Sequence, residues 1–154
     1  MSLLAPFPKQ LDQLNEAMER DLGFGFPKPG EMQCAGDIRC QWFGHNQAML
    51  TGDHAQKDWQ TMGLVTDQSD AWVVLLVQGL LVQEVLARLF PIDLATDQFP
   101  VGHTARSQCG HLNVCVSRTA DCSFEIMAFR SMAQSLKHEL TTAATLVAAR
   151  ARLA

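Results

Sequence analysis

The stretch that decides the fold covers residues 59–94 and reads WQTMGLVT (59–66), DQSD (67–70), AWVVLLV (71–77) and QGLLVQEVLARLFPIDL (78–94). Two apolar runs flank a polar turn, and the following residues have helical spacing, so the pattern predicts a hairpin over 59–77 that leads into a helix. This stretch carries no motif for catalysis, and its apolar side chains are the feature to be explained.

The second predicted strand is apolar on both faces. Because side chains alternate along a strand, one face receives Val73, Leu75 and Val77, and the other receives Trp72, Val74 and Leu76. The chain's own helices can bury one of these faces. The other face requires more helix, another subunit or a bound chain, and the strand is expected to be a central strand of a twisted sheet.

Composition limits the classes of function. The chain has 154 residues, 47% hydrophobic and 18% charged, with a formal net charge of −4, which is ordinary for one globular domain spanning residues 1–154. The acidic balance argues against nucleic-acid binding. We expect no signal peptide and no membrane insertion, and hence a soluble, cytoplasmic protein with five reduced cysteines.

The N-terminal half predicts one helix and weaker strands. Apolar residues spaced by three and four predict a helix over 8–22, with Pro8 in its first turn and a stop at Gly23. A Gly- and Pro-rich loop follows and carries Phe24 and Phe26. A first strand is expected within 32–43, and a weak strand over 48–51.

The C-terminal half predicts two further helices. One covers residues 80–89 and ends before Pro91, and strands are expected over 101–107 and 111–117. From Cys122 the apolar spacing alternates between four and three, which predicts a long helix with Asp121 as its N-cap. A short strand over 123–127 is the alternative for the start of that segment. The element order α-β-β-β-α-β-β-α indicates an α+β fold with an antiparallel sheet and about three helices.

No pattern of catalytic or ligand-binding residues emerges. Cys34 and Cys40 are six residues apart, as are Cys109 and Cys115, and neither spacing is that of a structural zinc site. The five histidines, at positions 45, 54, 103, 111 and 138, accompany no signature of a nucleophile, and no glycine-rich phosphate loop is present. We therefore expect no enzyme activity, no metal and no cofactor.

The chain resembles the effector-specific chaperones of bacterial type III secretion, of the CesT/Tir-chaperone type (class I), and among them those of plant-pathogen effectors. The resemblance is carried by the order of elements, by LVTDQSDAWVVLLV (64–77) and VQEVLARL (82–89), and by LFPIDLA (89–95), HLNVCVS (111–117) and SFEIMAF (123–129). The segment 44–57 and Pro91 depart from the family pattern.

This resemblance implies a homodimeric virulence chaperone in the bacterial cytoplasm. Such a protein would bind an extended N-proximal segment of a secreted effector, keep it secretion-competent, and present it to the secretion apparatus, including its ATPase. The implied dimer interface comprises Val82, Val85, Leu86, Leu89, Phe90 and Ile92. The implied effector-binding surface comprises Leu11, Leu14, Met18, Leu22, Phe24, Phe26, Leu64, Trp72 and Val74.

Two other classes stay open from the sequence. One is a non-chaperone α+β binding or regulatory module of the roadblock or YbjN-like kind, which would also dimerise. The other is a small enzyme that uses Cys109, Cys115 or His111, for which the number of Cys and His residues is the one motive.

Overall fold

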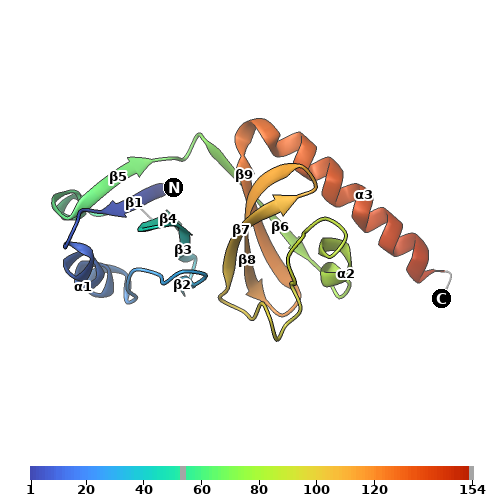
Figure 1. Cartoon of the computed structure of the whole chain (residues 1–154), viewed down its shortest axis with the longest axis horizontal. Coiled ribbons are helices and arrows are strands. Elements are labelled where there is room, and N and C mark those ends of the chain that lie inside the picture. The colour runs from blue at the N-terminus through green and yellow to red at the C-terminus, as the bar shows by residue number, and fades with distance from the viewer. Residues whose placement is uncertain (53–54, 153–154) are drawn as a thin grey trace. The chain divides into compact units, whose positions relative to one another are not determined.

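The computed structural model describes residues 1–52 and 55–152, which form two compact units, Met1–Asp70 and Ala71–Ala154 (Figure 1). Each unit has its own antiparallel sheet and its own helices, which confirms the α+β class. The single twisted sheet expected from the sequence is wrong, because the strands divide between two sheets. None of the described helices is long and apolar enough to cross a membrane.

The first unit contains a five-stranded sheet in the order β2-β3-β4-β1-β5. Its strands are β1 (Ser2–Pro6), β2 (Met32–Ala35), β3 (Ile38–Gly44), β4 (Gln47–Thr51) and β5 (Gly63–Asp67). Helix α1 (Leu11–Leu22) follows β1, and a short 3-10 helix, η1 (Lys57–Thr61), precedes β5.

The core of the first unit lies between α1 and its sheet. Leu14 and Met18 of α1 pack in one buried cluster with Leu4 of β1, Leu50 of β4 and Trp59 of η1. The helix therefore buries the apolar stripe that predicted it. Its stop is confirmed at Gly23, which adopts the left-handed conformation with φ 80°. Its start is wrong, because Lys9 has a φ of 68° and the helix begins only at Leu11.

The second unit contains a four-stranded sheet in the order β6-β9-β8-β7. Its strands are β6 (Trp72–Gln78), β7 (Thr104–Cys109), β8 (Leu112–Ala120) and β9 (Ser123–Phe129). Its helices are α2 (Val82–Leu86) and α3 (Ala133–Ala151), with a 3-10 turn, η2 (Arg130–Met132), before α3. Figure 1 shows α2 and α3 on the same side of this sheet.

The core of the second unit joins one sheet face to both helices. Val116 of β8 and Ile126 of β9 cluster with Leu86 of α2 and with Leu136 and Leu140 of α3. Val73, Leu75 and Val77 of β6 pack against the same cluster, so one face of the apolar strand is buried as expected. The expected helix over 80–89 is shorter in the structure, at Val82–Leu86.

The predicted hairpin over 59–77 is wrong, although both of its strands exist. β5 pairs with β1 in the first sheet, and β6 pairs with β9 in the second, so the polar turn at 67–70 joins two units instead of two paired strands. β5 begins at Gly63. A Cβ at this position would lie 2.7 Å from the Ala5 carbonyl oxygen of β1, so the close approach of the two strands requires a glycine here. β6 is consequently an edge strand and not the central strand that its two apolar faces suggested.

The helix expected from Cys122 onward is also wrong in its first part, where the alternative is confirmed. Residues 123–129 form β9, the strand that pairs with both β6 and β8, and the helix begins at Ala133. Phe124, Ile126 and Ala128 are all buried, which is the period of a strand. Asp121 therefore lies in the turn before a strand and caps no helix.

Candidate interaction surfaces

The residues of the implied dimer interface lie in the core of the second unit. Val82, Leu86 and Phe90 are buried there, and Leu89 and Ile92 are partly buried against the same cluster. Val85 is buried against Ala143 and Val147 of α3. Packing within the chain accounts for these side chains without a second copy. A charge at Val85 would therefore disrupt the packing of α2 against α3 whether or not a dimer forms.

The residues of the implied effector-binding surface divide between buried and accessible positions. Leu14, Met18, Leu22 and Phe24 belong to the core of the first unit, and Trp72 is buried, with its ring stacked on that of Phe129 at 4.3 Å between centroids. Leu11 is 40% exposed and Leu64 is 62% exposed. Phe26 and Val74 are partly buried.

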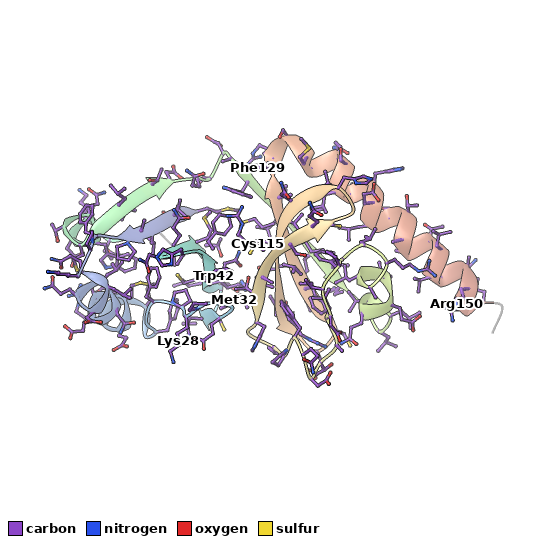
Figure 2. The ribbon with its side chains drawn as sticks, viewed as in Figure 1. Lys28, Met32, Trp42, Cys115, Phe129 and Arg150 are labelled. Atoms are coloured by element: carbon purple, nitrogen blue, oxygen red, sulfur yellow. The ribbon has the colours of Figure 1, made fainter. Side chains whose placement is uncertain are left out.

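Two of these residues, Leu11 and Phe26, line a groove in the first unit with a volume of about 460 Å³. Trp42 of β3 and His45 of the β3–β4 turn form its other side, which Figure 2 locates by the labelled Trp42 and Lys28. We call this the first-unit groove. Its complete lining is Leu11, Asp12, Asn15, Phe26, Pro27, Lys28, Pro29, Trp42, His45 and Asn46.

Local hydrogen bonds shape one wall of the first-unit groove. The Asn15 side-chain oxygen of α1 accepts a bond of 2.8 Å from the backbone N–H of Phe26, and the Asn15 amide group donates to Glu19 at 2.7 Å. The first bond connects the Phe- and Pro-rich loop to α1, and the second, between two residues of α1, orients the Asn15 side chain. Phe26 and Leu11 therefore line the groove in positions that the fold sets, which is what a preformed apolar site requires.

A second groove lies in the second unit between α2 and α3 and has a volume of about 220 Å³. We call it the helix groove. Its lining residues are Val77, Gln78, Gly79, Leu81, Val82, Val85, Ala144, Val147 and Ala148. Leu80 and Leu146, next to lining residues in the chain, are 92% and 54% exposed. Leu81, which lines the groove, is 41% exposed, and an accessible apolar side chain in a concave apolar surface is typical of a protein-binding site.

The most buried cation in the second unit, Arg118, holds the loop beside the helices. Its guanidinium donates to the carbonyl oxygens of Phe99 and Leu94, at 3.1 and 3.3 Å, and to the Thr96 hydroxyl at 3.0 Å. It also lies 5.1 Å from the centroid of the Phe124 ring. All its hydrogen-bond partners among the described residues are uncharged groups, so Arg118 organises the 94–99 loop and is unavailable to a ligand.

Three of the candidate thiols, those of Cys40, Cys109 and Cys115, are buried and are not activated. Burial raises the pKa of Cys40 to about 12 and that of Cys109 and Cys115 to about 11, which keeps these thiols protonated at neutral pH. Cys34 and Cys122 are exposed, and neither forms a disulfide. Among the described residues, no three His, Cys, Asp or Glu side chains are placed to hold a metal ion. His54, one of the histidines considered from the sequence, lies outside the described residues.

Several surface residues were missed from the sequence. The sequence pattern places Trp42 in a strand and Leu80 and Leu81 in a helix, and it does not single out Leu146. One signal was available for the leucine pair: Gly79 interrupts the apolar run, and neighbouring residues cannot both face one core. The fold places Trp42 of β3 and Leu11 of α1 in the lining of one groove, and no local sequence pattern indicates that they share it.

Comparison with known proteins supports the fold. No family model matches the chain, and no curated protein matches it. Among solved structures, the chain is similar to one chain of the heterotetrameric sarcosine oxidase from Corynebacterium sp. U-96, determined in complex with pyrrole 2-carboxylate. The TM-score is 0.79 at 23% sequence identity, and the likeness covers 92% of this chain and 77% of that chain. At this identity the likeness concerns the fold.

Proposed function

We propose that this chain is a non-catalytic subunit of a heteromeric amine-oxidising enzyme of the sarcosine oxidase type. The observation that carries the proposal is the likeness over 92% of the chain to a protein that is itself a heterotetramer. The helix groove, which is lined by the 41% exposed Leu81, supplies a surface suited to another subunit.

Co-expression with the products of the adjacent genes tests this proposal. A tagged chain is expected to purify in a stoichiometric complex that releases hydrogen peroxide when sarcosine is supplied. Leu81→Asp and Ala148→Asp are expected to remove the chain from the complex, because each places a charge in the lining of the helix groove. Leu64→Asp, at an exposed position of the first unit, is the matched control. Normal assembly of both groove variants would overturn the assignment of this surface.

The secretion chaperone is a second candidate, favoured by the first-unit groove. That groove brings together Leu11 and Phe26, two of the residues that the family resemblance implies for effector binding, with the additional aromatic surface of Trp42. An extended apolar segment fits such a groove. Under this proposal, co-expression keeps an otherwise aggregating neighbouring gene product in solution, and Leu11→Asp and Phe26→Asp abolish the effect. Failure to stabilise any neighbouring product, together with formation of an active oxidase complex, would reject the chaperone.

A further inference from the structure

The outer edge of β6 is exceptional among the edges of the two sheets. Sheet edges expose unpaired backbone groups, and proteins protect them with short strands or with charges. β2 has four residues, β5 contains Asp67 and β7 contains Arg106. β6 has seven residues, WVVLLVQ, and no charged side chain occurs anywhere in residues 71–83. Among the described residues, β6 therefore has the one long uncharged edge.

The alternation of hydrogen bonds along β6 identifies which of its backbone groups point away from β9. The Arg130 N–H donates to the Ala71 carbonyl at 2.8 Å, and the Gly79 N–H donates to the Cys122 carbonyl at 3.0 Å. Both pairs continue the register in which Val73 is opposite Ala128 and Val77 is opposite Phe124. Because hydrogen-bonded pairs alternate along antiparallel strands, the odd-numbered residues bond to β9. The backbone groups of Val74 and Leu76 are consequently directed to the outer edge.

We infer that the occupant of this edge is the β6 strand of a second copy of the chain, paired antiparallel about a two-fold axis at Leu75. This register sets residues 73–77 of the two copies opposite one another. It sets Val74 opposite Leu76 of the other copy as a hydrogen-bonded pair, which agrees with the direction of their backbone groups away from β9. It sets Leu75 opposite Leu75 of the other copy. The four-stranded sheets of the two copies then join into one continuous sheet.

Side-chain chemistry supports self-pairing over pairing with a charged strand. Leu76 is 58% exposed, and in this register it packs beside Val74 of the other copy on the same face of the joined sheet. No like charges meet, because the paired segment contains none. This inference goes beyond the proposed function, and it places a dimer at the strand edge instead of on the buried residues of α2.

A designed disulfide tests the register. In a Cys34→Ser, Cys122→Ser background, Leu75→Cys is expected to form a cross-linked dimer on mild oxidation, because opposite residues of a non-hydrogen-bonded pair lie within disulfide range. Val73→Cys alone faces residue 77 of the other copy and is the control that should not cross-link. The double variant Val73→Cys, Val77→Cys should cross-link again. Equal cross-linking of the Leu75→Cys and Val73→Cys variants would overturn the register.

Sedimentation of the full chain tests the association itself. Leu76→Lys is expected to raise the dimer dissociation constant by about tenfold or more, since it sets a charge in the apolar paired edge. Val101→Lys is the control, because Val101 is similarly exposed, at 49%, and lies before the opposite edge strand β7. A chain that is monomeric at all concentrations, or a dimer indifferent to Leu76→Lys, would overturn the inference. A monomer whose Leu76→Lys variant fails to enter a heteromeric complex would assign the edge to a different protein.

Discussion

The two units of the chain protect their sheets differently. Both outer strands of the first sheet are short or charged, with β2 limited to four residues and β5 ending at Asp67. In the second sheet, β7 carries Arg106, whereas β6 presents seven uncharged residues. The first unit is therefore built as a self-contained sheet, and the second unit keeps an edge on which another strand can pair.

The units also use arginine in opposite ways. Arg20 of α1 is exposed and binds the carboxylates of Asp21 and Asp58, at 2.7 and 2.9 Å. Arg118 of β8 is 1% exposed and binds carbonyl and hydroxyl oxygens of the loop that follows α2. A solvated ion pair contributes little to stability, whereas a buried cation that satisfies several carbonyl groups cannot be removed without leaving them unpaired. The second unit is expected to be far more sensitive to loss of its arginine.

The largest expected effect is that of Arg118→Met. This change removes the bonds to Leu94, Thr96 and Phe99 while keeping an unbranched apolar side chain. It is expected to destabilise the second unit by about 3 kcal/mol or more, because each buried acceptor left unpaired costs about 1–3 kcal/mol. Urea unfolding followed by circular dichroism measures the loss. Arg20→Met is the matched control in the first unit, and its unfolding midpoint should change little. Similar shifts for the two variants would contradict the contrast between the arginines.

Truncation of the two cores tests whether the units are independent. Leu86→Ala in the second unit and Leu14→Ala in the first each remove a fully buried side chain, at an expected cost of about 2–5 kcal/mol. Each cost should fall on its own unit, because the two residues belong to different buried clusters. Hydrogen exchange measured residue by residue resolves this. Equal loss of protection in both units from either variant would show that they unfold as one.

The fold class could be predicted from the sequence because it depends on local periodicity, and the pairing of strands could not. Residues 63–67 and 72–78 both have strand patterns, and the polar residues between them are a valid turn signal. The true partner of β5 is β1, at the other end of the unit in sequence. β1 was missed because Pro6 and Pro8 are typical of breaks. Pro6 is tolerated since it lies beyond the part of β1 that pairs with β4.

The candidate surfaces show the same limit. Phe26 could be selected from the sequence because an apolar residue in a Gly- and Pro-rich loop is hard to bury locally, although Phe24 in the same loop is buried. Leu11 was implied only by the family resemblance. Val82 and Leu86 have the same apolar spacing as a partner-binding stripe, yet they are core residues. Periodicity indicates that a face is apolar, and only the packing of distant elements determines whether that face is buried within the chain.

The pH dependence of stability offers a smaller test of the first unit. Bonds from Arg20 and then from the Trp59 indole lower the pKa of Asp21 below its ordinary value of 3.8. Because the folded-state pKa is lowered, the stabilisation is present above that ordinary value and is lost as the pH falls through the folded-state pKa. Urea midpoints for the first unit should therefore fall below about pH 4. Asp21→Asn should reduce this dependence, while Asp12→Asn, at an exposed position of the same helix, should leave it unchanged.

The smallest expected effects concern the exposed thiols, one in each unit. Cys34 and Cys122 are exposed, whereas Cys40, Cys109 and Cys115 are buried, with pKa values raised to about 12, 11 and 11. A thiol reagent at pH 8 should modify the first two rapidly and the other three only on unfolding, because the thiolate is the reactive form. Cys34→Ser and Cys122→Ser should each change the unfolding free energy by less than about 0.5 kcal/mol. Rapid modification of Cys115 in the folded chain would show that the second unit opens far more readily than its buried core implies.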